Sequence, residues 1–467
     1  MSSAPSLPIY LFTFNCARLL ITPAVLATHL FSALDPSSPP PEIIAIGLQE
    51  VAPISYSFLG GEYLAPYLDQ WSSVPHLAAQ YLHSSRPDFP SEYVELGRYT
   101  IGMTALFIFS RRGEQVRNLK FGSVGFGVMG MANKGAVAAR FGYSTTEDGD
   151  GGDGSEDINV TIVATHLAAH EHCCEDRNRD WETLSRGVVF ETSSTQTPPL
   201  GINITSSETT PLLPSENTTD SSSPELSGIY HPNTHLLVMG DLNYRTSHKS
   251  PTPEDFRTFP RSPDDFVEFF KRDQLTRERT AGNTLHGFTE APITFPPTYK
   301  YPEDVLSLLE DPEAGINGND KRQKSQDDVF DWSRNRWPSW CDRILWLSPP
   351  ATEGAENAIK VHKYTSIPAI RFSDHKPVGL HISLPKLNTN IPRKVTTGEE
   401  ATDKSDLRSN PPFPLDKDWK VKRYNAELKE WAIGYAILIA TTTNGLTVVG
   451  CLILGATMLW WGVTGRV

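Results

Sequence analysis

Five short polar patches stand at the ends of apolar runs, the position where an α/β sheet presents functional side chains. They are Phe14-Asn15, Gln49-Glu50, His166-Leu167, Gly240-Asp241-Leu242-Asn243 and Ser373-Asp374-His375. The side-chain oxygens of Asn15 and Glu50 suit a hard cation such as Mg²⁺. The other carboxylates and imidazoles suit the transfer of a phosphoryl group to water. Together the patches predict a metal-dependent phosphoester hydrolase.

Each patch also has a purely structural interpretation when it is taken alone. Asn15 and Asn243 could cap turns, Glu50 could be a surface carboxylate, and His166 could be a hydrogen-bonded core histidine. The combination favours catalysis over these interpretations. Asp374 next to His375 suggests a carboxylate that orients an imidazole, although the imidazole so oriented could be His166 instead.

Short apolar runs with branched and aromatic residues predict the strands that must position these patches. The runs cover residues 9–14, 43–48, 105–109, 136–141, 160–164, 236–239, 344–347 and 378–382. Helices are expected at 22–34, 62–84, 173–190 and 263–276. Because helices and strands alternate along the chain, we expect an α/β fold with sheets covered by helices.

Several segments are expected to lie outside this folded unit. Stretches near 145–157, 192–228 and 303–328 are rich in small polar or charged residues and predict flexible insertions into a catalytic domain at 1–385. Residues 386–431 are expected to form a linker that ends in a basic segment. Residues 432–463 contain no charged side chain and predict one transmembrane helix close to the C-terminus, a tail anchor with the domain in the cytosol.

Composition narrows the class of protein further. The net charge of −13 argues against a nucleic-acid-binding surface, which needs an excess of Lys and Arg. Five cysteines form no paired framework, so a reducing compartment is favoured.

Four longer motifs resemble the signatures of the inositol polyphosphate 5-phosphatase family, and their order along the chain also matches. They are Gly240-Asp-Leu-Asn-Tyr-Arg245, Phe295-Pro-Pro-Thr-Tyr-Lys300, Pro338-Ser-Trp-Cys-Asp-Arg343 and Ser373-Asp-His-Lys-Pro-Val378. With Gln49-Glu50, Asn133-Lys-Gly135 and His166-Leu-Ala-Ala-His170, the resemblance extends over residues 7–385. Ala136, where many members repeat glycine, and Phe14, where tryptophan is more usual, depart from the pattern without removing a charged group.

The resemblance implies a four-layer α/β sandwich of the endonuclease/exonuclease/phosphatase superfamily, in which two packed mixed sheets are flanked by helices. It implies Mg²⁺ held by Glu50 and helped by Asn15. Asp241 would be the general base, with His375 as the alternative, and Asn243 would position water or phosphate. His166 and His375 would stabilise phosphate charge, and Asp374 would orient His375.

The resemblance also implies a site for the substrate. Tyr299, Lys300 and Arg343 match positions that recognise a neighbouring ring phosphate, and Asn133 and Lys134 match a loop near the phosphodiester end. The loop 126–131 is apolar, and it could either dip into a bilayer or pack under the sheet. The closest architecture is that of tail-anchored fungal members, which implies phosphatidylinositol 4,5-bisphosphate as substrate and the endoplasmic reticulum membrane as location.

Two alternatives are weighed against this interpretation. A nuclease of the same superfamily would share the sheet and the Asp-His ending, but the acidic charge and the predicted anchor disfavour it. A non-catalytic phosphoinositide-binding tether would not need the full set of ionisable groups that is present here. The sequence does not distinguish a lipid substrate from a soluble inositol phosphate. It also does not indicate whether a 3-phosphate is tolerated or what the oligomeric state is.

Overall fold

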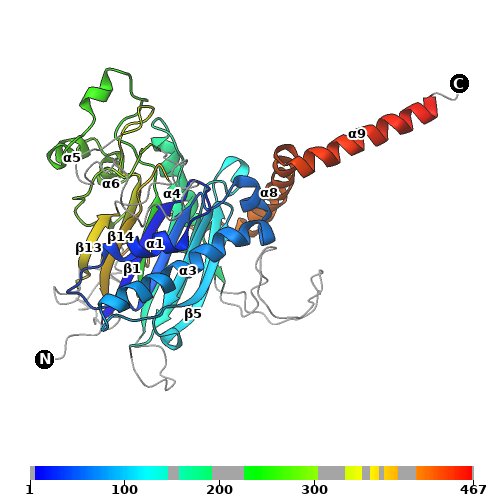
Figure 1. Cartoon of the computed structure of the whole chain (residues 1–467). Coiled ribbons are helices and arrows are strands. Elements are labelled where there is room, and N and C mark those ends of the chain that lie inside the picture. Colours follow the sequence, from blue (N-terminus) through cyan, green and yellow to red (C-terminus); the bar gives the residue numbers. More distant parts are fainter. Residues whose placement is uncertain are drawn as a thin grey trace, which may run out of the picture.

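Two six-stranded mixed sheets pack face to face in the computed structural model of this chain (Figure 1). The structure describes residues 6–145, 157–191, 226–302, 332–349, 358–367, 373–387 and 406–464. The first sheet has the order β13-β14-β1-β2-β4-β3, and the second has the order β11-β12-β10-β7-β6-β5. The predicted insertions and part of the predicted linker fall largely outside the described residues.

The strands of the first sheet are β1 (Ser6–Asn15), β2 (Ile43–Gln49), β3 (Val94–Ile101), β4 (Thr104–Ser110), β13 (Lys360–Ser366) and β14 (Val378–Pro385). Those of the second are β5 (Val116–Gly125), β6 (Gly135–Tyr143), β7 (Ile158–His166), β10 (Thr234–Asp241), β11 (Phe288–Thr289) and β12 (Asp342–Leu347). A small two-stranded antiparallel sheet pairs β8 (Phe190–Glu191) with β9 (Leu226–Ser227). Each large sheet contains one parallel pair, β1 with β2 and β7 with β10.

The helices are α1 (Pro23–Leu30), α2 (Ile54–Leu59), α3 (Gly61–Ser85), α4 (Cys174–Gly187), α5 (Pro263–Phe270), α6 (Gln274–Thr280), α8 (Trp419–Thr441) and α9 (Thr443–Thr464). Short 3₁₀ turns are η1 (Phe31–Ala33), η2 (Gly113–Gln115), η3 (Val128–Gly130) and η4 (Asp255–Thr258). The helix expected at 263–276 is divided in two. Asp273 caps the start of α6 by accepting a hydrogen bond from the Thr276 backbone N–H, which ends the first helix before it.

Alternating side chains of the strands build separate cores on the two faces of each sheet. Leu11 and Ile108 of the first sheet share a core with Ile162 of the second. The outer face of the first sheet packs on α1 and α3 through residues such as Phe12 and Trp71. The outer face of the second packs on α4 through a third core, which includes Val163, Val238, Trp181 and Leu184. This helix, sheet, sheet, helix order confirms the predicted sandwich.

The C-terminal part of the chain differs from the single helix predicted over 432–463. The helix α8 ends at Thr441, Thr442 is extended (φ −104°, ψ 144°), and α9 leads away from the domain (Figure 1). Thr441 to Thr443 and Asn444-Gly445 have low helix propensity, which accounts for the break. Among the described residues no single helix is both long and apolar enough to cross a membrane; α8 and α9 meet that test together, with an 87° bend between them.

The described part of the expected linker packs on the domain. Arg408 is buried and donates hydrogen bonds to the carbonyl oxygens of Thr234, Leu347 and Ser348. The helix α8 begins at Trp419, before the predicted anchor, and lies against α2 and the turn η3. Residues 406–441 therefore form part of the folded unit.

Candidate active site

All five polar patches meet at one edge of the sandwich. Four of them do so because the strands before them are parallel in pairs. Asn15 is in register with Gln49 at the ends of β1 and β2, and Asp241 is in register with His166 at the ends of β10 and β7. The Asn15 amide donates a hydrogen bond to Asp241 Oδ2 (3.0 Å), which joins the two sheets. The carboxyl ends of both parallel pairs thus converge on one site.

The carboxylate of Asp241 is the centre of this site. Its Oδ2 lies 3.2 Å from His166 Nε2 and 3.8 Å from His375 Nε2, and its Oδ1 accepts the backbone N–H of Asn243 at 3.1 Å. Gly240 before it has φ of 153°, and a Cβ there would lie 1.9 Å from the Thr165 carbonyl oxygen. Only glycine fits this close approach, which brings Asp241 against β7.

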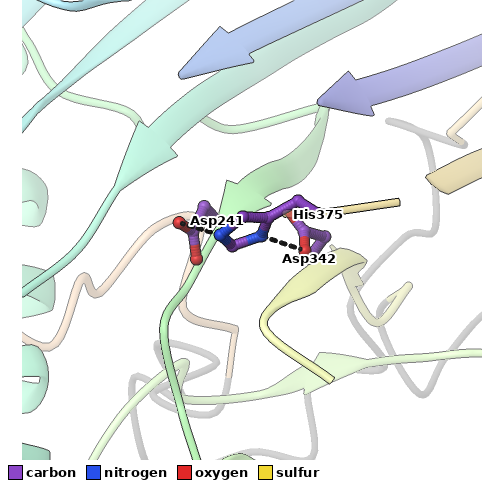
Figure 2. A group of neighbouring side chains, drawn as sticks. All are labelled: Asp241, Asp342 and His375. Atoms are coloured by element: carbon purple, nitrogen blue, oxygen red, sulfur yellow. Dashed lines mark hydrogen bonds and ion pairs between the residues drawn. The ribbon is translucent and has the colours of Figure 1, made fainter. Parts of the chain in front are cut away.

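His375 lies between two carboxylates (Figure 2). Its Nδ1 donates to Asp342 Oδ2 at 2.8 Å, and the Thr298 hydroxyl donates to the same oxygen at 2.7 Å. The ring of Tyr299 packs on His375 with centroids 4.6 Å apart. These contacts hold the imidazole with Nε2 towards Asp241.

The carboxylate that orients His375 is therefore Asp342, and not Asp374 as the sequence suggested. Asp374 Oδ2 instead accepts a hydrogen bond from Lys300 Nζ at 2.7 Å. Neighbouring side chains in extended chain point in different directions, so Asp374 turns away from the ring beside it. Asp374 and Lys300 form a pair at the rim of the site.

The charges of the site follow from burial and from these contacts. Burial alone would lower the pKa of His375, but Asp342 and Asp241 outweigh it and raise the pKa to about 9. Burial and the Lys134 ammonium lower the pKa of His166. Burial would raise the pKa of Asp241, but His375 and His166 hold it below the ordinary value. At neutral pH the site thus combines a cationic His375, a neutral His166 and an ionised Asp241.

Lys134 and Asn133 lie in the loop between η3 and β6. Lys134 Nζ is 3.3 Å from His166 Nδ1 and 4.0 Å from Glu50 Oε1. Asn133 Oδ1 is buried and has no hydrogen-bond partner among the described residues. The loop therefore reaches the site beside His166 and Glu50, and the substrate contacts of Asn133 and Lys134 stay predictions.

Glu50 and Asn15 offer oxygen ligands at the same edge. The Glu50 side chain is 25% exposed, with Oε2 3.1 Å from Arg18 Nε, and its backbone has φ of 47°, in the left-handed region. Asn15 Oδ1 accepts the Ala17 backbone N–H at 3.0 Å. An accessible carboxylate beside a buried amide fits a hard cation, and Glu50 with Asn15 would hold it.

A second group of possible ligands consists of Asp241, Asp342 and His375, whose ligand atoms all lie within 4.8 Å of one another. His375 Nδ1 already donates to Asp342 Oδ2, and the Thr298 hydroxyl donates to the same oxygen, so hydrogen bonds occupy these atoms. We therefore assign this group to the hydrogen-bonded arrangement above and not to a metal.

Arg343 does not reach the site. Its side chain is fully buried, with Nη2 2.6 Å from Glu290 Oε2 and Nη1 3.1 Å from Asp273 Oδ2. Two carboxylates thus occupy the donors that were predicted to bind a ring phosphate. The role that the geometry supports for Arg343 is structural.

Replacing Arg343 by methionine is expected to lower the free energy of unfolding by about 3–5 kcal/mol, because two buried carboxylates lose their common partner. Urea unfolding followed by circular dichroism measures this loss. Removing the charges of both partners in the same chain, with Asp273→Asn and Glu290→Gln, is expected to restore part of it. Unchanged stability with a raised KM would instead support the substrate role.

Two functional candidates were missed from the sequence although both lie in the quoted motifs. One is Asp342. The other is Arg245, which is buried, donates through Nε to the Asn243 carbonyl oxygen at 3.0 Å, and lies 4.3 Å from the Tyr299 ring centroid. Its Nη1 has no partner among the described residues. The available signal was a charged residue near the end of an apolar run: Asp342 is the first residue of β12, and Arg245 follows the end of β10 at Asp241.

The sandwich and the polar edge define a protein of the endonuclease/exonuclease/phosphatase class. The family model described as Endonuclease/Exonuclease/phosphatase family 2 matches residues 12–381. The match covers most of the chain, which therefore belongs to this family.

Two curated relatives that are similar to this chain are named as 5-phosphatases of an inositol phosphate or a phosphoinositide. The mouse type II inositol 1,4,5-trisphosphate 5-phosphatase is 27% identical over 80% of this chain and 30% of its own length. The Saccharomyces cerevisiae phosphatidylinositol 4,5-bisphosphate 5-phosphatase INP51 is 26% identical over 72% of this chain and 27% of its own length. The chain thus matches less than a third of either relative.

Among solved structures, the inositol polyphosphate 5-phosphatase domain of a synaptojanin is similar in fold. That domain was crystallised with inositol (1,4)-bisphosphate and a calcium ion. The TM-score is 0.53 at 21% sequence identity, over 82% of this chain and 85% of the other. The likeness supports the four-layer architecture.

Proposed function

We propose that this chain hydrolyses the 5-phosphate of phosphatidylinositol 4,5-bisphosphate with Mg²⁺ as cofactor. The observation that carries the proposal is the convergence of Asp241, His166 and the His375–Asp342 pair on the sheet edge that bears Glu50. The names of the mouse and yeast relatives support an inositol phosphate or phosphoinositide substrate. Other inositol polyphosphates are further candidate substrates.

In the proposed reaction, water attacks phosphorus, the bond from phosphorus to the ring oxygen breaks, and the ring oxygen takes a proton from solvent and leaves as a hydroxyl group. Protonated His375 cannot accept a proton, so Asp241 is the proposed acceptor of the water proton. The low pKa of Asp241 makes it a weak base, and Mg²⁺, when bound, makes a water more acidic. Asn243 would position the water or the phosphate.

Cationic and neutral donors would hold the phosphate groups. The His375 imidazolium and His166 would stabilise the negative charge on the phosphate under attack. Lys300 and Tyr299 lie beside His375 on one side, and Lys134 lies beside His166 on the other. This placement agrees with a substrate that carries more than one phosphate, for which Lys134 and Lys300 supply separate charges.

We also propose that α8 and α9 tether the enzyme to the endoplasmic reticulum membrane with the catalytic domain in the cytosol. The helix α9 exposes large apolar side chains such as Leu452, Met458 and Trp461. Val128 and Met129 of η3 are 72% and 68% exposed, which favours bilayer contact over packing under the sheet for this loop. Lys420, Lys422 and Lys429 would lie near anionic headgroups.

The test is phosphate release by the full chain in vesicles, with phosphatidylinositol 4,5-bisphosphate, soluble inositol phosphates and abasic-site DNA as substrates. We expect release from the lipid, loss of release with EDTA, and recovery with Mg²⁺. Glu50→Gln is expected to raise the half-saturating Mg²⁺ concentration by roughly 10–100-fold, because a neutral amide is a weaker ligand than a carboxylate.

Two results would overturn the proposal. Cleavage of the DNA without release from any inositol phosphate would identify a nuclease. Binding of the lipid without release, at saturating Mg²⁺, would identify a non-catalytic tether. A Glu50→Gln chain with an unchanged Mg²⁺ titration would remove Glu50 from the metal site and leave the substrate assignment intact.

A further inference from the structure

The C-terminal helix α8 contacts the loop that leads to Lys134. Glu430 Oε1 accepts a hydrogen bond from the Ala132 backbone N–H at 2.8 Å. The buried residues of α8 are Ala426, Glu430 and Gly434, which are four residues apart and share one face of the helix. On that face, a Cβ at Gly434 would lie 3.0 Å from Leu59 Cγ of α2. The contact with Ala132 is thus part of a continuous seam.

Glu430 is held in place by a second residue of α8. Arg423 donates to both carboxylate oxygens of Glu430, at 2.8 and 2.9 Å, and also to Glu427 Oε1 at 3.0 Å. Glu430 is 3% exposed and Ala132 is fully buried. A buried carboxylate that accepts a backbone N–H forms a strong, charge-assisted hydrogen bond. The positive charge of Arg423 compensates the negative charge of Glu430. Glu427 also pairs with Arg423, but it forms no hydrogen bond with the described loop residues.

Backbone hydrogen bonds extend this contact towards both sides of the candidate site. The Ala132 carbonyl oxygen accepts from Met103 N at 3.1 Å, and the Met103 carbonyl oxygen accepts from Val51 N at 3.2 Å. Ala132 directly precedes Asn133 and Lys134, and Val51 directly follows Glu50. Glu430 therefore stands at the start of a hydrogen-bonded path to the predicted substrate loop and to the predicted metal ligand.

The loop has little support on its other side. A cavity of about 630 Å³ is lined by Gly125, Phe126, Gly127, Met129 and Gly130 of the loop, together with residues of α4 and α8. Side chains do not fill this space. Backbone hydrogen bonds such as Gly127 N–H to the Met131 carbonyl oxygen and Phe126 N–H to the Lys134 carbonyl oxygen close the loop on itself, and the Ala132–Glu430 hydrogen bond fixes it to α8. An unpaired Ala132 N–H would remain buried with no other partner, and the loop would shift to find one.

We infer that Glu430 is a positioning residue of the active site, through which the C-terminal helix holds Asn133 and Lys134 in place for substrate. The inference rests on the proposed function, since it takes Asn133 and Lys134 as substrate-binding. It goes further in making the membrane-proximal helix part of the active-site framework and not only a tether.

The experiment compares full-length Glu430→Ala, Glu430→Gln and Glu427→Ala chains with the unaltered chain in the same vesicles. The substrate is a soluble inositol trisphosphate, so that changes in membrane binding do not alter the result. Glu430→Ala is expected to raise KM roughly tenfold, with kcat changing less than about threefold, because a buried backbone donor loses its acceptor. Glu430→Gln keeps an oxygen acceptor and is expected to recover most of this loss.

Hydrogen exchange measured by mass spectrometry over residues 127–134 supplies a readout that does not require activity. Exchange there is expected to rise in Glu430→Ala, to stay near the unaltered level in Glu430→Gln, and to be unchanged in Glu427→Ala. Gly434→Leu, which crowds Leu59 and separates α8 from α2, is a second variant that should reproduce the Glu430→Ala pattern if the latter fails to fold.

The inference is overturned if exchange in the loop is the same in Glu430→Ala as in the unaltered chain. It is also overturned if Glu427→Ala raises KM as much as Glu430→Ala does, since the effect would then come from Arg423 and helix stability. An unaltered chain that releases phosphate neither from this soluble substrate nor from phosphatidylinositol 4,5-bisphosphate would defeat the proposed function, and the exchange data would still decide whether Glu430 holds the loop.

Discussion

The Asp241→Asn chain is expected to lose roughly 10²–10⁴-fold in kcat, the range for removal of a general base, while it stays folded. Asparagine has the shape of aspartate but can present only one acceptor oxygen. Its NH₂ group would face the Asn15 amide and His166 Nε2, or the Asn243 backbone N–H. The substitution would also remove the negative charge of Asp241 that lies beside Nε2 of the His375 imidazolium.

Steady-state kinetics at saturating Mg²⁺ measures this loss, and the thermal unfolding midpoint checks the fold. Glu42→Gln is the matched control. Glu42 is a buried carboxylate at the other end of β2, paired with Arg111 and Arg112, and its removal should affect stability without reducing kcat. A kcat for Asp241→Asn within a few-fold of the unaltered chain would remove Asp241 from the chemistry.

The strands that could be predicted from the sequence are those that are buried on both faces. The apolar runs identified β1, β2, β4, β6, β7, β10, β12 and β14. The strands without a prediction include β3, β5 and β13, each at an edge of its sheet. Edge strands mix polar with half-buried residues, as in the sequence of β13, and a hydrophobic run does not distinguish them from loops.

The members of the site could be predicted, but not all of their pairings. The strand ends that carry Asn15, His166 and Asp241 were identified because polar residues interrupt apolar runs. The partner of His375 could not be identified, since Asp342 is 33 residues away and its approach depends on the register of β12 with β10. Sequence adjacency favoured Asp374, and adjacency carries no information on side-chain direction.

Strand alternation also explains the error at Arg343. Asp342 and Arg343 are consecutive residues of β12, so their side chains point to opposite faces of the sheet. The Asp342 side chain points towards His375 on one face. The Arg343 side chain therefore points to the other face, where it pairs with Asp273 and Glu290. A motif that contains both residues does not reveal which one faces the substrate.

At the C-terminus, hydropathy identified an uncharged segment but not how it is divided. The absence of charge over 432–463 does not indicate the break at Thr442, which depends on local propensity over a few residues. It also gives no sign of the contact between Glu430, which stands just before that segment, and the Ala132 backbone N–H. The burial of an acidic side chain against a backbone N–H that is far away in the sequence depends on the tertiary fold, which hydropathy does not reveal.

Asp342→Asn is expected to lower kcat/KM roughly 10²-fold at about pH 8 and to move the alkaline limb of the pH profile to lower pH. In the unaltered chain Asp342 and Asp241 raise the pKa of His375 to about 9 against the effect of burial. The imidazolium is therefore present below about pH 9 and is lost as pH rises through that value. Without the Asp342 charge, burial prevails and the proton is lost earlier.

The measurement is kcat/KM against pH for the unaltered chain, Asp342→Asn and Asp374→Asn. Asp374 is the matched control, because it adjoins His375 in sequence but pairs with Lys300. Its replacement should raise KM and leave the alkaline limb close to that of the unaltered chain. A larger shift of the limb in Asp374→Asn than in Asp342→Asn would restore the assignment that sequence adjacency suggested. Because a raised pKa also stabilises the fold at low pH, Asp342→Asn should lose more stability below the ordinary histidine pKa than above about pH 9.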